Sequence, residues 1–195
     1  MTNPVTNRLN DIIRAIDERR EGKERVVVAL DGRSAAGKTT FALELGSRVG
    51  ATVIHLDHFF LRPEQRTEER LSEPGGNVDY ERFLSEVLLP LVRGIPFSYR
   101  PFDCKIMEFR DPIEVIPGDT VVIEGAYACH PRFREHYDLT VFLSIDPAEQ
   151  LKRILEREGE MTARVFRERW IPMEERYIAF YQIPEHCDMV FNVCE

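Results

Sequence analysis

The chain has 195 residues, a length that favours one domain with a core large enough to fold without disulfide or metal support. Its 34 acidic residues outnumber its 26 basic residues, and the net charge of −8 argues against a non-specific binder of nucleic acid or of an anionic membrane. The four cysteines form no C-x-x-C pair, and no apolar run approaches about 18 residues. We therefore expect a soluble, reduced, cytoplasmic protein with residues 1–195 in a single domain.

The hydrophobic pattern predicts buried strands that alternate with amphipathic helices. In chain order, the expected elements are a helix over residues 7–20, a strand over 25–30, a helix over 38–49, a strand over 52–56, a helix over 80–92, strands over 120–123 and 139–145, a helix over 146–158, a helix over 162–181 interrupted at Pro172, and a strand over 189–193. Continuous short apolar runs are typical of strands covered on both faces. This alternation predicts an α/β fold, with a five-stranded parallel sheet and helices on both faces.

Four segments complete the expected architecture. Residues 1–22 are expected to pack an N-terminal helix on the domain. Residues 62–77 are polar and rich in proline and glycine, which predicts a mobile surface segment. Residues 97–114 are aromatic and mixed, which predicts a hairpin or a loop that covers a substrate. Gly159 breaks the helical pattern inside a zone, about residues 153–170, that we interpret as a helical lid.

One motif lies directly after the first long strand. Residues 32–39 match the pattern G-x-x-x-x-G-K-[ST] in full. Glycines let backbone N–H groups curl around phosphate oxygens, the lysine can reach the terminal phosphates, and the hydroxyl can bind Mg²⁺. The motif therefore predicts a P-loop NTPase fold that binds ATP and Mg²⁺. The expected phosphate-binding residues are Gly32, Arg33, Ser34, Ala35, Ala36, Gly37, Lys38, Thr39 and Thr40.

Two carboxylates follow the second and third expected strands. Asp57 and Glu124 stand at strand ends, and the carboxyl ends of parallel strands meet at one edge of a sheet, beside the phosphate loop. We interpret Asp57 as the base for an acceptor hydroxyl, Glu124 with Thr39 as the magnesium ligands, and Lys38 as a third catalytic residue. The alternatives are a helix cap for Asp57, a turn residue for Glu124, and an exchange of their two roles.

Six short segments stand in a distinctive order, at residues 31–40, 55–60, 77–80, 101–103, 122–125 and 146–147. Together they resemble the uridine kinase family of P-loop nucleoside kinases. The resemblance implies an ATP-dependent phosphotransferase that acts on a hydroxyl of a nucleoside-like small molecule, with uridine or cytidine as the first acceptor to consider. It also implies that Asp57 acts on the acceptor 5′-hydroxyl and that Asp79 binds ribose. A helix cap is the alternative for Asp79.

The segment that contacts the pyrimidine in that family differs in this chain. The family typically has Tyr-Asp followed by a histidine, where this chain has Phe102-Asp103 followed by Met107. Phe102 can stack on a base and joins Arg110 in the expected acceptor site, but Met107 cannot hydrogen-bond a base edge. Core packing is the alternative for Phe102 and Met107. Nicotinamide riboside, pantothenate and sugar-type alcohols therefore stay open as acceptors.

The family also carries an arginine-rich segment that closes over the phosphates. Arg157 and Arg164 flank Gly159 in the expected lid and are predicted to bind ATP phosphates, with a solvated helix face as the alternative. A nucleotide-dependent regulatory ATPase is the rival interpretation of the whole chain. We expect a small-molecule substrate, no nucleic-acid partner and no membrane partner, and the sequence leaves a homo-oligomer open.

Overall fold

The computed structural model describes residues 4–194, so the first three residues of the expected N-terminal segment 1–22 lie outside the described residues. The helices are α1 (Pro4–Arg19), α2 (Lys38–Val49), α3 (Glu68–Ser72), α4 (Tyr80–Phe83), α5 (Leu89–Val92), α6 (Pro147–Val165) and α7 (Ile171–Tyr181). The strands are β1 (Val26–Gly32), β2 (Thr52–His55), β3 (Phe97–Tyr99), β4 (Phe102–Asp103), β5 (Glu108–Phe109), β6 (Ile113–Val115), β7 (Thr120–Glu124), β8 (Leu139–Ser144) and β9 (Met189–Asn192). No helix within residues 4–194 is long and apolar enough to cross a membrane.

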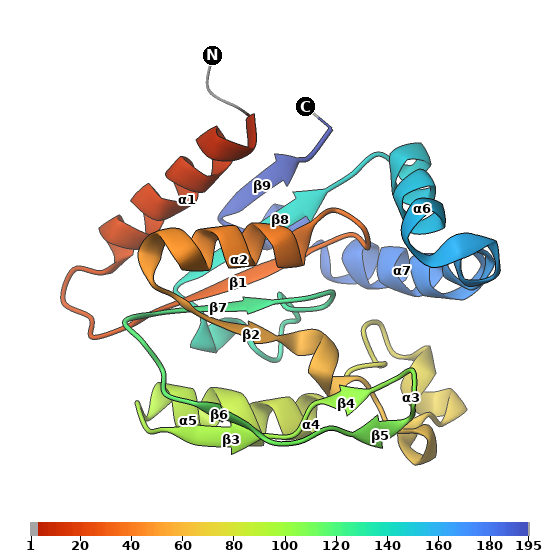
Figure 1. Ribbon diagram of the computed structural model, residues 1–195, viewed down its shortest axis with the longest axis horizontal. Coiled ribbons are helices and arrows are strands. Elements are labelled where there is room, and N and C mark those ends of the chain that lie inside the picture. Colours follow the sequence, from red (N-terminus) through yellow and green to blue (C-terminus); the bar gives the residue numbers. More distant parts are fainter. Residues whose placement is uncertain (1–3, 195) are drawn as a thin grey trace.

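Five strands form one parallel sheet in the order β2-β7-β1-β8-β9 (Figure 1). Every residue of β1 and of β7 is buried, as their continuous apolar sequences predict for strands covered on both faces. The predicted five-stranded parallel sheet is confirmed. Its order places the end of β1, where the phosphate motif begins, between the ends of β7 and β8.

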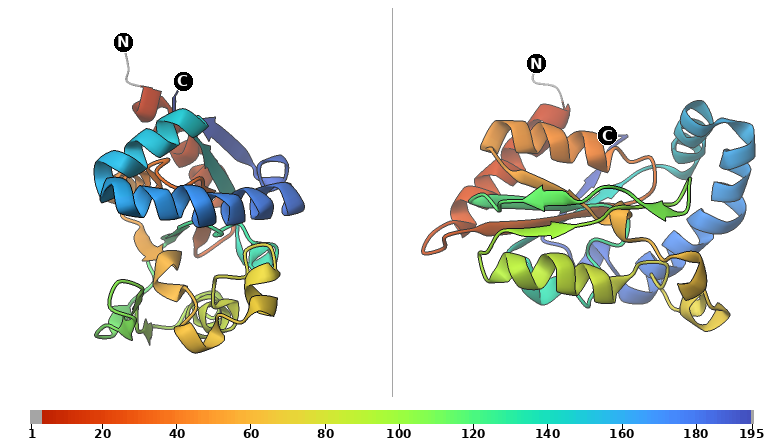
Figure 2. Two further views of the ribbon diagram at one scale, coloured as in Figure 1. Left: turned by 90° about the vertical axis from the view of Figure 1, so that its right-hand side faces the viewer. Right: turned by 60° about the horizontal axis from the view of Figure 1, so that its bottom comes forward.

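Helices cover both faces of the sheet, and each face has its own core (Figures 1 and 2). Successive residues of β1 point to opposite faces, so Val26 and Val28 join one core while Val27 and Ala29 join the other. The first core packs the sheet against α1 and α2. The second core packs it against α4, α5 and α7. The expected α/β layering is therefore confirmed.

Two helical runs contain a π-helical turn just before a proline. The turns are Leu84–Leu88, ahead of Pro90, and Phe166–Trp170, ahead of Pro172. In each run, the residue before the proline donates its N–H to the carbonyl five residues back. Proline lacks an N–H and clashes with the carbonyl four residues back, and the wider turn accommodates both effects. The helical run therefore continues through Pro172, and the break expected at Gly159 is present as a kink with φ 78° and ψ 172°.

The two segments expected to be irregular both contain regular structure. Residues 97–114 form a hairpin in which β3 pairs with β6 and β4 with β5, both antiparallel, so the hairpin interpretation is confirmed. Residues 62–77 contain a 3₁₀ turn and α3, which the polar composition did not predict. Arg70 ties this segment to α4, because its guanidinium lies 3.8 Å from the ring centre of Tyr80 and donates to the Val78 carbonyl at 2.9 Å.

Phe83 provides a test of the core below the sheet. Its side chain is fully buried, with the rings of Phe59 and Phe133 edge-on at 5.0 and 4.9 Å. Phe83→Ala should lower the free energy of unfolding by about 3–5 kcal/mol, because it removes a buried ring and leaves a cavity. Phe180→Ala, at a side chain that is 66% exposed, is the matched control and should change it by less than about 0.5 kcal/mol. Urea unfolding followed by circular dichroism measures both, and equal losses would contradict this description of the core.

Candidate active site

The phosphate motif forms a concave loop between β1 and α2. Ala35 and Gly37 both have positive φ, 60° and 87°, a conformation that turns successive backbone N–H groups toward the inside of a loop. No described side chain caps the N-terminus of α2, so its first N–H groups stay available beside the loop. Gly32 is required at the loop's start, because a Cβ there would lie 2.2 Å from the Leu143 carbonyl oxygen. The loop is therefore shaped to accept an anion.

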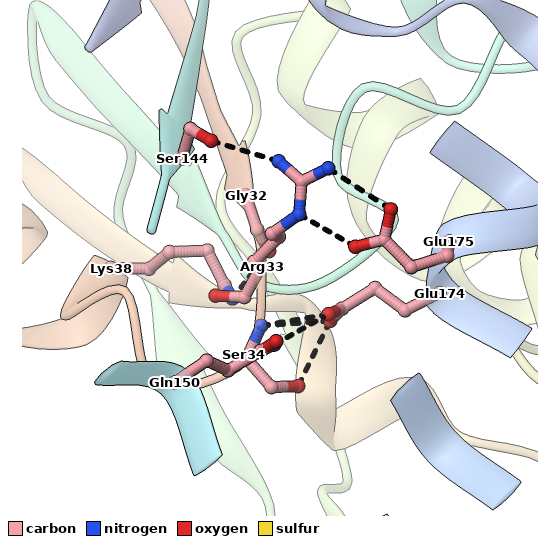
Figure 3. Close-up of polar contacts among 8 residues, drawn as sticks. All are labelled: Gly32, Arg33, Ser34, Lys38, Ser144, Gln150, Glu174 and Glu175. Carbon is pink, nitrogen blue, oxygen red and sulfur yellow. Dashed lines mark hydrogen bonds and ion pairs between the residues drawn. The ribbon is translucent and has the colours of Figure 1, made fainter. Parts of the chain in front are cut away.

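Lys38 is held over this loop by the loop itself. Its Nζ donates to the carbonyl oxygens of Gly32 at 2.7 Å and Arg33 at 3.1 Å (Figure 3). The side chain is buried, so the ammonium group has one defined position rather than many solvated ones. This pre-arranged cation is what the motif predicts for binding of terminal phosphates.

Glu124 and Thr39 meet at the edge of the sheet, as the sequence predicts. Glu124 is the buried last residue of β7, and Thr39 Oγ1 lies 3.2 Å from each of its carboxylate oxygens. His55 stands in register with Glu124, with Nδ1 2.5 Å from Oε1. Hydrogen bonding to Glu124 raises the pKa of His55 above its ordinary value, because it favours the charged imidazole. His55 was not predicted; the parallel register of β2 and β7 aligns it with Glu124.

Asp57 lies beyond the end of its strand, whereas the sequence analysis placed it at the strand end. β2 ends at His55, and Asp57 sits in the 3₁₀ turn Leu56–Phe59 instead of directly after the strand. A Cβ at Gly125 would lie 2.9 Å from Asp57 Oδ1, so this glycine makes room for the carboxylate beside β7. The side chain is accessible to solvent, yet desolvation by the protein around it raises the pKa of Asp57 to about 6; the Lys38 charge opposes this shift and the Glu124 charge adds to it.

A buried aspartate that the sequence analysis did not assign connects the surrounding elements. Asp31, the residue before Gly32, accepts hydrogen bonds from the backbone N–H groups of Gly32 at 2.6 Å, Tyr127 at 3.0 Å and Cys129 at 2.9 Å. The Tyr177 hydroxyl on α7 donates a fourth at 2.7 Å. An acid inside an otherwise apolar strand was the available signal for this role. Burial raises the pKa of Asp31, against the effect of these hydrogen bonds and of Lys38.

Two adjacent glutamates of α7 contact the phosphate loop (Figure 3). Glu175 accepts from Arg33 Nε at 2.6 Å and Nη2 at 3.0 Å, and Arg33 Nη1 donates to Ser144 Oγ at 2.8 Å. Glu174 accepts from the Ser34 backbone N–H and hydroxyl. No local pattern indicated these contacts, because about 140 residues separate the partners in sequence. The Arg33 side chain is thus hydrogen-bonded to Glu175 of α7 and to Ser144 of β8.

Asp79 is buried, and both of its oxygens have protein donors. Oδ1 accepts from the Arg82 backbone N–H at 3.1 Å, which caps α4, and Oδ2 accepts from Gln65 Nε2 at 2.8 Å. The helix-cap alternative is therefore present in the structure. The ribose-binding role of Asp79 stays a prediction.

Phe102 and Met107 line one cavity of about 400 Å³ beside the hairpin. Phe109 also lines it, with its ring 5.6 Å from that of Phe102. The charged lining residues are two arginines and two glutamates, Arg62, Arg100, Glu64 and Glu108. Phe102 is buried and Met107 is 45% exposed, so this residue pair combines a packed ring with an accessible side chain.

Arg110, the remaining predicted acceptor residue, pairs instead with Asp103. Its Nη2 lies 2.6 Å from Asp103 Oδ2, and its side chain is 57% exposed. This ion pair spans the ends of β4 and β5 in the hairpin. A role for Arg110 in acceptor binding stays a prediction.

The predicted lid arginines pair with neighbouring glutamates in this conformation. Arg157 donates to Glu158 and Arg164 to Glu168, at 2.8 and 2.9 Å, and both guanidinium groups are largely exposed. Arg153 is the arginine of this zone that reaches the loop, with Nη1 3.5 Å from the Ala35 carbonyl oxygen. Phosphate binding by Arg157 and Arg164 stays a prediction; a change of the kink at Gly159 would move Arg164 relative to Arg153 and Arg157, which both precede it.

Comparison with solved structures identifies the fold. A possible uridine kinase from Bacillus stearothermophilus matches 93% of this chain and 99% of its own, with a TM-score of 0.65 and 19% identity. A candidate fructose transport system kinase from Silicibacter sp. TM1040 matches 94% and 98%, with a TM-score of 0.72 and 19% identity. The chain has the P-loop NTPase fold. No family model matches its sequence.

A third structure shares this fold in spite of a rearranged chain order. It is a candidate P-loop kinase with a circular permutation, from Saccharomyces cerevisiae, and matches 97% of this chain and 98% of its own with a TM-score of 0.64 and 14% identity. Because the sequence identities are this low, these structural matches establish the shared P-loop NTPase fold and nothing more.

The residues beside the P-loop fit a magnesium ion. Mg²⁺ prefers oxygen ligands, and it is usually held by one or two protein groups together with waters and substrate phosphates. The Thr39 hydroxyl and the Glu124 carboxylate supply two such oxygen groups, already hydrogen-bonded to each other under the loop. These two oxygen groups are as many protein ligands as a bound Mg²⁺ usually has.

The Asp57 carboxyl should titrate near pH 6, and its neighbours should shift that value in opposite directions. Glu124→Gln should lower the Asp57 pKa, because it removes a nearby negative charge, and Lys38→Met should raise it. Because the folded pKa lies above the ordinary unfolded value of about 3.9, this group should reduce stability as pH rises from about 4 through about 6. Carboxyl ¹³C NMR titration measures the pKa, and shifts in the same direction for both variants would contradict the assigned charges.

Proposed function

We propose that this protein is an ATP-dependent kinase that transfers the γ-phosphoryl group to a hydroxyl of a small, nucleoside-like molecule. The observation that carries this proposal is the joint position of Lys38, Glu124 and Asp57 at one edge of the sheet, around an N–H-lined phosphate loop. A loop for phosphates alone would serve many nucleotide-dependent proteins. An accessible carboxylate with a pKa of about 6 beside that loop is suited to acid–base work near neutral pH.

Each residue has a chemical role in the proposed transfer. The loop N–H groups and Lys38 neutralise charge on the ATP phosphates, which is the main demand of phosphoryl transfer. Thr39 and Glu124 would hold Mg²⁺, which supplies charge neutralisation between the β- and γ-phosphates when bound. Asp57 is largely ionised at neutral pH and orients the acceptor hydroxyl and accepts its proton. His55 holds Glu124 in place through its hydrogen bond.

The cavity beside the hairpin is the proposed acceptor site. Its volume of about 400 Å³ and its aromatic residues Phe102 and Phe109 suit a planar group of nucleoside size. Uridine and cytidine are the first acceptors to test, since a solved structure of this fold is described as a possible uridine kinase. Nicotinamide riboside, pantothenate and sugar alcohols are the alternatives, because Met107 offers no hydrogen bond to a base edge.

A panel of these acceptors with Mg-ATP tests the proposal. At least one acceptor should accelerate ADP release above the intrinsic hydrolysis rate and yield a phosphorylated product, measured by a coupled ADP assay and mass spectrometry. Lys38→Met serves as the control that removes phosphate binding. Hydrolysis that no small acceptor stimulates would reject the kinase proposal and favour the regulatory ATPase.

Asp57→Asn should lower kcat at least ~100-fold with the best acceptor, the usual scale for an acid–base group, and should leave the Kd for Mg-ATP within about threefold. Asn keeps the size of the side chain but cannot take a proton. Asp119→Asn is the matched control, at a carboxylate that is 85% exposed in the turn before β7, and should keep wild-type turnover. Steady-state kinetics and equilibrium binding measure the two effects, and unchanged turnover of Asp57→Asn would remove Asp57 from the mechanism.

A further inference from the structure

A carboxylate of the protein already occupies donors of the phosphate loop. Glu174 Oε1 and Oε2 lie 2.9 and 3.0 Å from the Ser34 backbone nitrogen, and the Ser34 hydroxyl donates to Oε1 at 2.9 Å (Figure 3). Gln150 on α6 donates to Oε2 at 3.2 Å. The Glu174 residue is only 3% exposed, although it carries an ionisable group. The Glu174 carboxylate is therefore a negative group of the protein itself, buried at a loop whose N–H groups are expected to bind phosphate.

Two contacts that follow Glu174 along α7 hold this helix beside the loop. Glu175 makes two hydrogen bonds to Arg33 of the loop. The Tyr177 hydroxyl, three residues after Glu174, donates to the buried Asp31. These contacts do not involve the Glu174 carboxylate, so they can hold its backbone near Ser34 when that carboxylate loses its partners. A negative charge at Glu174 would then stay close to the negative charges of ATP.

The titratable and charged groups around Glu174 come from four parts of the chain. Lys38 and Arg33 belong to the phosphate motif, Asp31 is the next-to-last residue of β1, Tyr127 follows β7, and Glu175 is its neighbour on α7. Burial raises the pKa of Glu174 above its ordinary value, Lys38 and the Ser34 hydrogen bonds oppose this, and Asp31 adds to it. The Lys38 ammonium group thus stabilises the charge of two buried carboxylates, Asp31 and Glu174. The phosphate oxygens of ATP would compete for the same cation.

We propose that Glu174 is a proton-linked gate of the phosphate site: ATP takes over the Ser34 donors, and the Glu174 carboxylate takes up one proton from solvent as the phosphate arrives. The resulting neutral carboxylic acid keeps its position beside Gln150 and can donate to a phosphate oxygen. ATP affinity then rises as pH falls, because binding consumes a proton. This inference rests on the proposed ATP site and adds a residue that determines its affinity and pH response.

Calorimetric titration of the full chain with Mg-ATP tests the gate. Wild type, Glu174→Gln and Glu185→Gln are each titrated at a mildly acidic and a mildly alkaline pH, in two buffers of different ionisation enthalpy, which gives the number of protons taken up. Glu174→Gln should bind Mg-ATP about tenfold more tightly than wild type at alkaline pH, the scale of one hydrogen bond to a charged group, and should take up fewer protons. Glu185→Gln, the control at an exposed glutamate in the 3₁₀ turn after α7, should keep the wild-type proton uptake.

The comparison between variants isolates Glu174 from other titrating groups. Asp57, Asp31 and the nucleotide are present in all three titrations, so the part of their proton uptake that does not depend on Glu174 is subtracted in the differences. Equal proton uptake by wild type and Glu174→Gln, or weaker binding by Glu174→Gln at alkaline pH, would overturn the gate and leave the proposed kinase intact. Failure of all three proteins to bind Mg-ATP would overturn both proposals. Thermal unfolding of each variant checks that the binding differences come from folded protein.

Discussion

The phosphate loop depends on the buried carboxylate of Asp31. This one group accepts hydrogen bonds from the start of the loop, from the segment after β7 and from Tyr177 on α7. An ionisable group that is 1% exposed costs free energy unless its hydrogen bonds are satisfied, and here four donors satisfy it. Loss of any one of these donors would leave part of the buried carboxylate without a hydrogen bond, which costs free energy. The loop, the Glu124 edge and α7 are therefore fixed relative to one another.

The region around the phosphate loop contains more carboxylates than cations. Asp31, Asp57, Glu124 and Glu174 gather around the loop, and the Lys38 ammonium group is their principal cation, since the Arg33 guanidinium is engaged by Glu175. The raised pKa of Asp57, about 6, is one consequence, because desolvation and the charge of Glu124 both act on it. A bound nucleotide would add several negative charges to this set. Protons and Mg²⁺ are the natural means of restoring balance, which links the proposed kinase chemistry to the proposed gate at Glu174.

The backbone of α6 departs from regular helical geometry at Gly159. The kink at Gly159 separates the part of α6 that bears Arg153 from the part that bears Arg164. Arg153 already reaches the loop, whereas Arg157 and Arg164 pair with neighbouring glutamates in exposed positions. The α7 end of this run is anchored by Glu174, Glu175 and Tyr177. A hinge at Gly159 could therefore bring distal arginines toward phosphate without disturbing the loop.

The sequence by itself determined the sheet, the phosphate loop and the meeting of Thr39 with Glu124, because continuous apolar runs, a spaced glycine motif and strand ends are local signals. It also predicted the hairpin over residues 97–114, but it left α3 unseen, because the proline and glycine content of that polar segment outweighed a local signal, the Thr67 N-cap followed by two glutamates. Only the tertiary structure decided that Glu174 and Glu175 contact the loop and that both oxygens of Asp79 are taken by protein donors. Those contacts join elements far apart in the chain, and their partners are chosen by packing geometry that no local pattern records.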